Sequence, residues 1–267
     1  MSSRHSPTLT VMVQAARKAA RTLSRDFGEV ENLQVSVKGP GDFVSAADLR
    51  AEETIREELT RARPGYGFLL EEGGAIAGSD KSHRWIVDPL DGTTNFLHGI
   101  PLFAINIALE REGEIVAGVT YNPISDELFW AEKGKGAFIN DKRLRVAARR
   151  DLSQSVVCTG IPHIGAKDYG RFSRELATIM PQVAGVRRTG SCAIDMAFVA
   201  AGRFDAYWES GLNPWDLAAG LILVREAGGT VTDLNNGSDI LGQGSVLATN
   251  ETLHKPLFNI IKKAGAA

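Results

Sequence analysis

The chain has 267 residues, of which 43% are hydrophobic, 23% charged and 7% aromatic. This composition excludes disordered, collagen-like and coiled-coil proteins, and the length supplies enough core for one large domain or two modest ones. The 30 basic and 32 acidic residues give a net charge of −2, so no positive field favours nucleic acid. Only Cys158 and Cys192 are present, which argues against a disulfide scaffold or a thiolate zinc site and fits a reducing cytoplasm.

No segment has the pattern of a signal peptide or a membrane span. The N-terminal apolar stretch, Leu9 to Ala16, is short and is followed at once by Arg17 and Lys18. The longest nearly uncharged run, at about 97–109, falls well short of the ~18–20 residues that a membrane helix needs. We therefore expect a soluble, cytoplasmic protein.

The first 150 residues predict two helices followed by an antiparallel sheet. Apolar residues at three- and four-residue spacing predict a helix over 8–27, and a second helix covers 46–62 and stops at Pro64-Gly65. Short apolar strands then end at acidic residues, and a meander follows with turn residues between its strands. The predicted strands are 68–70, 85–87, 103–110, 115–121, 127–131 and 136–140.

After about residue 150 the pattern changes to alternating strands and helices. The helix at 214–227 is the best defined, with Asn213 as N-cap, Pro214 at its first position and Gly228-Gly229 after it, and its apolar interior predicts burial on several sides. We expect one compact unit with a soft boundary: an N-terminal α+β half (1–150) and a C-terminal α/β half (151–267). The predicted elements are strands 155–159, 185–189, 205–208, 230–232 and 245–249, and helices 168–180, 191–202, 214–227 and 251–263.

Three segments contain acidic residues but no lysine or arginine. Residues 64–80 contain Glu71, Glu72 and Asp80; residues 85–110 contain Asp88, Asp91 and Glu110; residues 204–224 contain Asp205, Glu209 and Asp216. Buried carboxylates without partners are very costly. These acids therefore need solvent, partners from elsewhere in the fold, or a metal ion.

The sharpest of these segments runs from Trp85 to Phe96. An apolar strand is predicted to end at Asp88, Pro89 fixes a turn, and Asp91-Gly92 reverses the chain before Thr93 and Thr94 open a short helix. Two carboxylates and a backbone carbonyl then surround one bend, which suits Mg²⁺, and free N–H groups just beyond it suit a phosphate. This arrangement predicts that metal and phosphate meet at one place.

Each of these acids also has an ordinary structural interpretation. Asp-Pro and Asp-Gly are common turn dipeptides, and Asp216 and Asp48 each lie in the first turn of a predicted helix, where an acid stabilises the helix dipole. Glu71-Glu72 alone would fit a solvated loop. The combination of the bend, Thr93-Thr94 and the two other base-free segments favours the metal interpretation.

At this point the sequence resembles a known family, the inositol monophosphatases of the magnesium-dependent, lithium-sensitive phosphatase superfamily. The segment from Asp88 to Thr94 matches the first family signature, and the segment from Trp215 to Gly220, continuing to Gly229, matches the second. Glu71-Glu72, Asp48 and Gly190-Ser191 fall in the expected order. The resemblance covers nearly the whole chain and is closest to the bacterial branch.

The resemblance implies a role for each matching residue. Glu71, Asp88, Asp91, Asp216 and the Leu90 carbonyl would hold two or three Mg²⁺ ions, with Li⁺ as an inhibitor. Thr93, together with Asp48 and Glu71, would orient the attacking water. The implied substrate contacts are Glu71, Leu90, Asp91, Gly92, Thr93, Arg187, Gly190, Ser191, Cys192, Glu209 and Asp216.

Among these contacts, the backbone N–H groups of Gly92 and Thr93 would hold phosphate oxygens, and Glu209 would accept hydrogen bonds from substrate hydroxyls. Cys192 stands where relatives often have alanine, and it is interpreted as cavity wall and not as nucleophile. Arg187 and Arg188 match a segment near the substrate mouth and the dimer contact of bacterial relatives, although a solvated strand edge explains them equally well.

The fold implied by the resemblance is a layered αβαβα sandwich like that of inositol monophosphatase and fructose-1,6-bisphosphatase, usually a homodimer. The implied reaction is hydrolysis of myo-inositol monophosphate by activated water, in line and without a covalent intermediate. Fructose 1,6-bisphosphate, histidinol phosphate and 3′-phosphoadenosine 5′-phosphate are alternative substrates of relatives.

Other classes of function have less support. Some bacterial relatives associate with the transcription machinery, and the local basic cluster of Lys142, Arg143, Arg145, Arg149 and Arg150 is the one feature here that would suit such a role. The balanced net charge does not favour it, and a charge run is usually a solvated face. The five scattered histidines form no catalytic motif, and glycosidase chemistry would leave the anion-binding turn unexplained.

Overall fold

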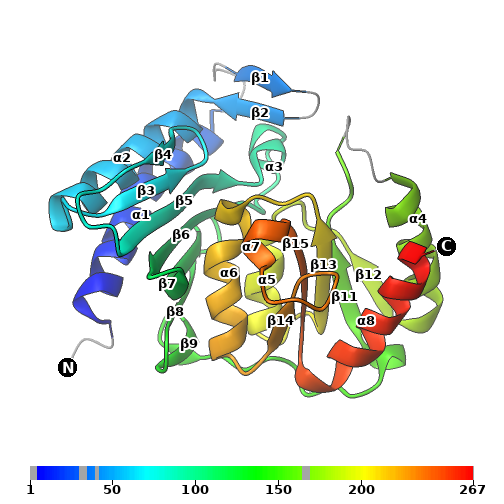
Figure 1. The fold of residues 1–267 in the computed structure, drawn as a ribbon. Helices are drawn as coiled ribbons and strands as arrows, with labels where there is room; N and C mark the ends of the chain where they lie inside the picture. Colours follow the sequence, from blue (N-terminus) through cyan, green and yellow to red (C-terminus); the bar gives the residue numbers. More distant parts are fainter. Residues whose placement is uncertain (1–4, 30–34, 40–41, 164–168, 267) are drawn as a thin grey trace.

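The computed structural model describes residues 5–29, 35–39, 42–163 and 169–266. Figure 1 shows the helices and strands in chain order. The helices are α1 (Pro7–Phe27), α2 (Ala46–Ala62), α3 (Thr93–Leu97), α4 (Tyr169–Ile179), α5 (Cys192–Ala200), α6 (Pro214–Glu226), α7 (Ile240–Gln243) and α8 (Glu251–Ala266). The strands are β1 (Val35–Gly39), β2 (Asp42–Ser45), β3 (Gly67–Leu70), β4 (Gly74–Ile76), β5 (His83–Asp91), β6 (Ala104–Arg111), β7 (Glu114–Asn122), β8 (Glu127–Glu132), β9 (Gly136–Ile139), β10 (Lys142–Arg143), β11 (Val156–Thr159), β12 (Gly185–Arg187), β13 (Ala206–Ser210), β14 (Thr230–Thr232) and β15 (Ser245–Thr249).

An eight-stranded sheet contains the predicted meander. Its strand order is β10-β9-β8-β7-β6-β5-β3-β4, and successive strands from β5 to β10 pair antiparallel. Within β5 the side chains alternate between the faces: Trp85 and Val87 pack toward α1 and α2, whereas Ile86 packs toward the opposite core. Both faces are therefore buried, which explains the continuous apolar runs of these strands.

A five-stranded mixed sheet follows, with the order β12-β11-β13-β15-β14. Here too the strands bury both faces. Tyr207 of β13 packs toward α5 and α6, and its neighbour Trp208 packs toward α4 and α8. The two sheets are consequently joined by the helices that lie between them.

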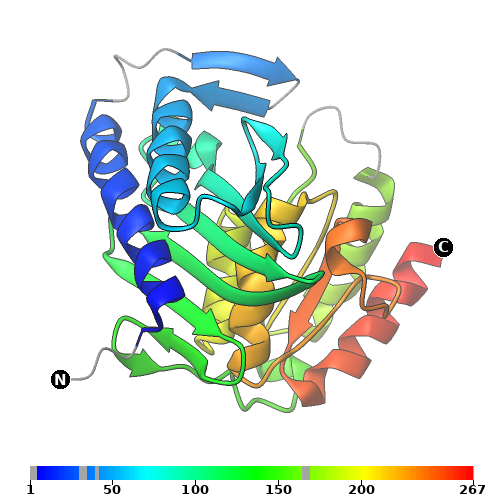
Figure 2. The ribbon, with the colours of Figure 1, turned by 60° about the vertical axis from the view of Figure 1, so that its left-hand side comes forward.

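The layers stack in the order helices, sheet, helices, sheet, helices, as Figures 1 and 2 show. Helices α1 and α2 cover the outer face of the eight-stranded sheet, α5 and α6 fill the space between the sheets, and α4 and α8 cover the outer face of the five-stranded sheet. The predicted αβαβα sandwich is confirmed.

Helix α6 lies at the centre of this stack, and every residue from Leu217 to Val224 is buried. Two glycines, Gly118 and Gly220, allow close contact between α6 and its neighbours β7 and α5. A Cβ added at Gly118 of β7 would lie 2.7 Å from Ile222 Cγ2, and one at Gly220 would lie 2.5 Å from Met196 Sδ of α5. These close approaches fix where the N-terminus of α6 lies, and that end carries Asp216.

The structure corrects some predicted boundaries. Strand β5 does not end at Asp88 but runs on to Asp91, because an irregularity in its pairing with β6 accommodates Pro89. Five further elements were not predicted, because they are short and carry little periodicity: β1, β2, β4, β10 and α7. Helix α4 is described from Tyr169, so the predicted start at residue 168 lies outside the described residues.

Within the described part of the chain, none of the helices pairs the length of a membrane span with the apolar character that one needs.

The contact between β7 and α6 generates a stability prediction. Gly118→Ala would force a methyl group against Ile222 and the backbone of Ala219, and we expect the free energy of unfolding to fall by about 1–3 kcal/mol. Urea denaturation measures this change.

The matched control is Gly170→Ala on the exposed side of α4, where an added Cβ would lie 3.5 Å from Arg174 Nη1, an ordinary van der Waals distance. Alanine in a helix should raise the unfolding free energy there by about 0.4–1 kcal/mol. Equal effects at both positions would contradict the proposed close packing of α6.

Candidate metal and phosphate site

The end of β5 brings two carboxylates to one side of the chain. In a regular strand, residues three apart point to opposite faces. The pairing of β5 with β6 is irregular between Asp88 and Asp91, and the Leu90 N–H donates to Asp88 Oδ1 at 2.9 Å. This local distortion lets the two aspartates face the same point.

The third carboxylate comes from α6, the helix that lies between the two sheets. Asp216 is the third residue of α6, and its Oδ2 accepts a hydrogen bond from the Asn213 N–H at 2.7 Å, which caps the helix. Oxygens of Asp88, Asp91 and Asp216 all lie within 4.8 Å of one another. Three acids that are far apart in the sequence thus meet at one point.

Crowding and burial perturb the protonation of these acids. Burial, followed by the nearby carboxyls of Glu71, Asp91 and Asp216, raises the pKa of Asp88 well above its usual range. Burial also raises the pKa of Asp91 to about 6, although hydrogen bonds from Ser191 and Ala193 partly oppose this rise. The pKa of Asp216 is raised well above its usual range by burial first and by Asp91 second.

The chemistry of this donor set fits a divalent cation. The three clustered groups are carboxylates that offer only hard oxygen ligands, and a nearby positive charge would relieve their mutual repulsion. Glu71, at the end of β3, adjoins the group through a hydrogen bond with Asp88. The predicted ligand Leu90 lies between the two aspartates of β5, so its carbonyl is part of the same bend.

Asp48 and Thr93 also come together beside this bend. Asp48 is fully buried in the first turn of α2, and Thr93 begins α3. The Thr93 hydroxyl lies 3.2 Å from Asp48 Oδ1 and 3.1 Å from the Leu90 carbonyl oxygen. Residues from two helices and one strand therefore form a hydrogen-bonding group at the edge of the carboxylate cluster.

Gly92 makes the turn between β5 and α3. Its φ of 97° favours glycine, and an added Cβ would lie only 3.0 Å from the Leu102 carbonyl oxygen. The first N–H groups of a helix have no acceptor within it, so the N–H groups of this turn are available to an anion.

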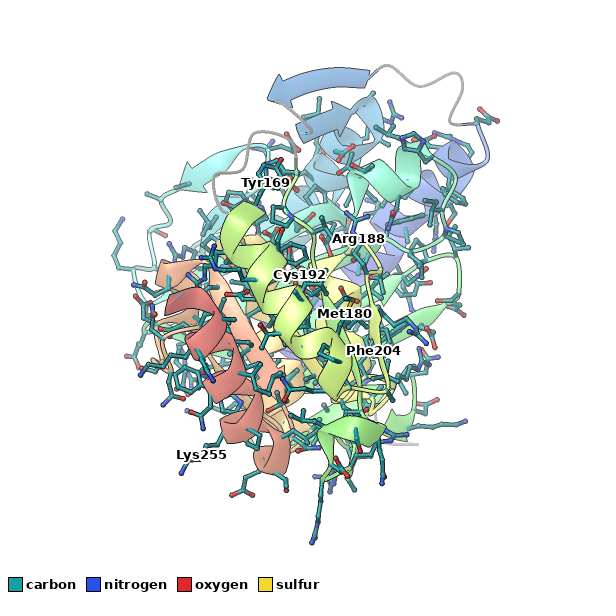
Figure 3. The ribbon with its side chains drawn as sticks, turned by 90° about the vertical axis from the view of Figure 1, so that its right-hand side faces the viewer. Tyr169, Met180, Arg188, Cys192, Phe204 and Lys255 are labelled. Carbon is teal, nitrogen blue, oxygen red and sulfur yellow. The ribbon has the colours of Figure 1, made fainter. Side chains whose placement is uncertain are left out.

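A cavity of about 180 Å³ opens beside the carboxylate cluster. Six of the predicted substrate contacts line it, and Arg188 and Cys192, both among the lining residues, are labelled in Figure 3. The lining residues are Asp91, Gly160, Ile161, His163, Arg188, Gly190, Ser191, Cys192, Asp195, Glu209, Leu212 and Asp216.

Arg187 is not among the residues that line this cavity. It ends β12 on the surface, where its Nη1 donates to the Val186 carbonyl at 3.0 Å, and Arg188 lies at the cavity instead. Gly160 and Asp195 line the cavity as well, and neither was predicted to do so. Asp195 carried a signal that could have been noticed, because it is a single acid within the apolar run 192–201.

Glu209 reaches the cavity from β13. The Tyr207 hydroxyl donates a hydrogen bond to its carboxylate. Burial raises the pKa of Glu209 to about 7, and the Tyr207 hydrogen bond acts in the opposite direction. A Cβ at Gly160 would lie 1.9 Å from this carboxyl group, so residue 160 must be glycine for Glu209 to occupy its place.

Cys192 forms part of the cavity wall, with 7% of its surface exposed. Burial, together with the acids Asp91, Glu209 and Asp216, raises the pKa of its thiol well above the usual range. A thiol that resists ionisation is a poor nucleophile, which agrees with the predicted role as wall.

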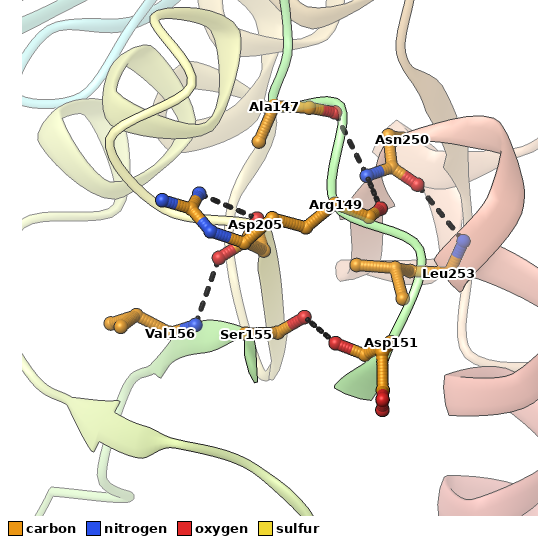
Figure 4. Close-up of polar contacts among 8 residues, drawn as sticks. All are labelled: Ala147, Arg149, Asp151, Ser155, Val156, Asp205, Asn250 and Leu253. Atoms are coloured by element: carbon orange, nitrogen blue, oxygen red, sulfur yellow. Dashed lines mark hydrogen bonds and ion pairs between the residues drawn. The ribbon is translucent and has the colours of Figure 1, made fainter. Parts of the chain in front are cut away.

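The basic cluster at 142–150 lies apart from the cavity, and one of its arginines has a structural role. Figure 4 shows that Arg149 Nη1 contacts Asp205 Oδ1, at 3.1 Å, while Asp205 Oδ2 accepts from the Val156 N–H. Asn250 donates to the carbonyls of Ala147 and Arg149. Residues 147–149 are therefore held to the chain around the five-stranded sheet, whereas Lys142 and Arg143 form β10 of the eight-stranded sheet.

A larger hollow, of about 710 Å³, lies between α2 and β4, and its lining contains none of the predicted site residues. Its size alone does not connect it with the carboxylate cluster.

Comparison with known proteins identifies the family. A family model described as the inositol monophosphatase family matches residues 4–265. The chain is 62% identical over 258 residues to an inositol-1-monophosphatase of Mesorhizobium japonicum, with 97% of each chain covered. It is 40% identical over 256 residues to Nus factor SuhB of Pasteurella multocida, with 96% of each chain covered.

A solved structure agrees with these sequence matches. The extragenic suppressor protein suhB of Bartonella henselae superimposes with a TM-score of 0.95 at 57% identity, covering 97% of this chain and 99% of that one. The family resemblance and the phosphatase class predicted from the two signature segments are confirmed: the chain belongs to the inositol monophosphatase family.

Proposed function

We propose that the protein is a Mg²⁺-dependent phosphomonoesterase that hydrolyses myo-inositol monophosphate to inositol and phosphate. The observation that carries this proposal is the meeting of Asp88, Asp91 and Asp216 within 4.8 Å beside the Gly92 turn. A relative that is 62% identical over 97% of the chain and is named inositol-1-monophosphatase supports the choice of substrate.

The metal ligands in this proposal are Glu71, Asp88, Asp91, Asp216 and the Leu90 carbonyl, which would hold two or three Mg²⁺ ions. The bound ions would supply Lewis acidity, which lowers the pKa of water and neutralises charge on the leaving oxygen. The buried aspartates supply the negative charge that retains the cations, and the helix caps and strand contacts described above keep their carboxylates in place.

The remaining residues orient the reactants. The N–H groups of Gly92 and Thr93 hold phosphate oxygens, while Asp48 and the Thr93 hydroxyl orient the attacking water. The water oxygen forms a bond to phosphorus in line with the ester bond that breaks; the water gives up one proton, and the leaving alkoxide takes up one proton to become the free hydroxyl. Gly190, Ser191, Cys192 and Glu209 line the side of the site that faces the polyol.

Phosphate release from inositol 1-phosphate tests the proposal directly. We expect turnover that requires Mg²⁺ and is suppressed by Li⁺. A panel with fructose 1,6-bisphosphate, histidinol phosphate and 3′-phosphoadenosine 5′-phosphate belongs in the same assay. Faster hydrolysis of one of these, with poor turnover of inositol 1-phosphate, would keep the reaction class and replace the substrate.

Asp216→Asn tests the metal assignment. The amide keeps the size of the side chain and can still accept from the Asn213 N–H, but it removes the charge of a ligand. We expect kcat to fall by about 100-fold or more while the protein remains folded.

The control for Asp216→Asn is Asp239→Asn, because Asp239 is exposed and caps the short helix α7, a position where asparagine serves equally well. Its kcat should match that of the unaltered protein. Near-normal turnover of Asp216→Asn would remove Asp216 from the metal site.

The raised pKa of Glu209 predicts a pH-dependent cost to stability. Between its ordinary value of about 4.5 and its folded value of about 7, the folded protein retains a proton that the unfolded chain releases. The free energy of unfolding should therefore fall as the pH rises through this window. Glu209→Gln, which remains neutral, should lack this contribution.

Urea denaturation in the presence of a chelator, repeated through the window, measures the difference between the two proteins. Relative to Glu209→Gln, the unaltered protein should lose stability up to about pH 7 and then keep a constant difference. A difference that does not vary with pH would show that Glu209 ionises normally in the folded protein.

We also propose that the protein acts in the cytoplasm as a homodimer, as the family resemblance implies. Light scattering would give twice the chain mass of 28.7 kDa for a dimer. The alternative of a transcription-associated role rests on the relatives named Nus factor SuhB and has less support here, since Arg149 of the basic cluster is committed to Asp205.

A further inference from the structure

The carboxylate cluster is assembled from both halves of the molecule. Asp88 and Asp91 belong to β5 of the eight-stranded sheet, whereas Asp216 belongs to α6. Asp91 in turn receives its hydrogen bonds from Ser191 and Ala193, at the N-terminus of α5. The geometry of the cluster therefore depends on how the first turns of α5 and α6 are placed against the end of β5.

Asn106 connects the first turn of α6 to the strand next to Asp88. It lies on β6 directly opposite Asp88 in the pairing with β5, and only 1% of its surface is exposed. Its amide nitrogen donates to the carbonyl of Trp215 at 2.8 Å and to that of Asp216 itself at 3.1 Å. The Asn106 side chain thus connects β6, at the residue paired with Asp88, to the backbone of Asp216.

The orientation of the Asn106 amide follows from its partners. Two backbone carbonyls can only accept hydrogen bonds, so the side-chain nitrogen must face them. The side-chain oxygen then accepts from the Thr120 hydroxyl on β7 at 2.6 Å. Because all three partners are satisfied in a buried setting, the amide has one favourable arrangement, and it holds the two carbonyls at a fixed distance from β6.

Asn95 makes a second connection of the same kind, at α5. It is buried in α3, and its amide nitrogen donates to the Leu102 carbonyl at 2.6 Å and to the Thr189 carbonyl at 2.8 Å. A Cβ on Gly190 would lie 3.0 Å from this amide, so the chain leading to Ser191 passes directly over it. Ser191 and Ala193 follow at once and hold Asp91.

We propose that Asn106 and Asn95 are positioning residues for the metal site: Asn106 fixes the N-terminus of α6 against β6, and Asn95 fixes the chain that enters α5 against α3, the helix that directly follows Asp91 and Gly92. This inference rests on the proposed function, because it assumes that these acids bind Mg²⁺. Neither asparagine contacts the metal or the substrate in this proposal. Their effect passes through Asp216 in one case and through Asp91 in the other.

The test uses Mg²⁺ alone, without substrate. Asn106→Leu and Asn95→Leu keep a side chain of similar size but cannot donate to the carbonyls. Titration calorimetry should show the Kd for Mg²⁺ rising by about tenfold or more in each variant, as is typical when groups that orient metal ligands are removed. The increase in Tm that saturating Mg²⁺ produces in the unaltered protein should shrink accordingly.

The matched control is Asn122→Leu. Asn122 is also a buried asparagine, on β7, but its side chain bonds to the Pro101 carbonyl and to the N–H groups of Ile124 and Ser125. Its loss should lower the Tm of the metal-free protein while leaving the Kd for Mg²⁺ and the Mg²⁺-induced increase in Tm unchanged. A merely structural role for Asn106 and Asn95 would give this same pattern in their variants.

A milder variant keeps the test decisive if Asn106→Leu does not fold. Thr120→Val removes only the hydroxyl that orients the Asn106 amide, and it should weaken Mg²⁺ binding in the same direction by a smaller factor. Each asparagine is tested by at least one variant: Asn95 by Asn95→Leu, and Asn106 by Asn106→Leu or Thr120→Val. Normal Mg²⁺ affinity at both sites would overturn this inference and leave the proposed function standing. Absence of Mg²⁺ binding by the unaltered protein would overturn the proposed metal site, and this inference with it.

Discussion

Repulsion among buried carboxylates is the constraint on which this structure depends. Asp88, Asp91 and Asp216 lie within 4.8 Å of one another; burial raises the pKa of each, and neighbouring carboxyls raise the pKa of Asp88 and Asp216 further. Proteins are stable by only about 5–15 kcal/mol, so a cluster of like charges is a substantial cost. A fold can maintain such a cluster only if the surrounding structure is rigid and if some nearby positive charge offsets the repulsion.

The two central helices supply part of that offset. The Ala193 N–H, in the first turn of α5, donates to Asp91, and Asp216 lies in the first turn of α6. The N-terminus of a helix carries a partial positive charge. Since both helices are buried between the sheets, their dipoles point at the cluster through a medium that screens them weakly. The middle layer of the sandwich therefore stabilises the acids electrostatically, because the positive N-termini of α5 and α6 point toward them.

Rigid placement of these helices explains several residues that the reaction itself does not use. Gly118 and Gly220 let α6 approach β7 and α5 more closely than any side chain would permit. Asn106 then bonds to the first turn of the same helix from β6. Close backbone contact fixes the helix against translation, and the amide fixes its end. The glycine contacts and the Asn106 amide together hold Asp216 in a defined position.

How far the sequence predicts these features depends on the range of the interaction. The apolar spacing of α1, the capping residues of α6 and the turn residues of the meander are local signals, and they predicted those elements within a few residues. The bend that carries Asp88 and Asp91 was predicted as a metal site because these acids lie in a segment without basic residues. Asn95 and Asn106, in contrast, are single polar residues whose partners lie 94 and about 110 positions away, and no local pattern indicates such bonds.

The choice between Arg187 and Arg188 illustrates the same limit at a smaller scale. Neighbouring residues at the end of a strand point in opposite directions, so a shift of one residue decides which arginine faces the cavity. In the structure β12 ends at Arg187, which pairs with Cys158 of β11, and Arg188 follows the strand. The structure places Arg188 at the cavity, and Arg188 is also the arginine whose charge acts on Glu209 and Asp195.

If the protein acts as proposed, selectivity among phosphate esters depends on this wall of the cavity. The phosphate group is the same in every candidate substrate, so the metal ligands and the Gly92 turn cannot distinguish one polyol from another. In the proposed function, the groups that would face the rest of the substrate are Arg188, Cys192 and Glu209, which line the cavity. Glu209, with a pKa of about 7, accepts hydrogen bonds from hydroxyls when it is ionised and can donate one when it is protonated. The same carboxyl can therefore satisfy different hydroxyl patterns, which favours a site that accepts more than one small polyol phosphate.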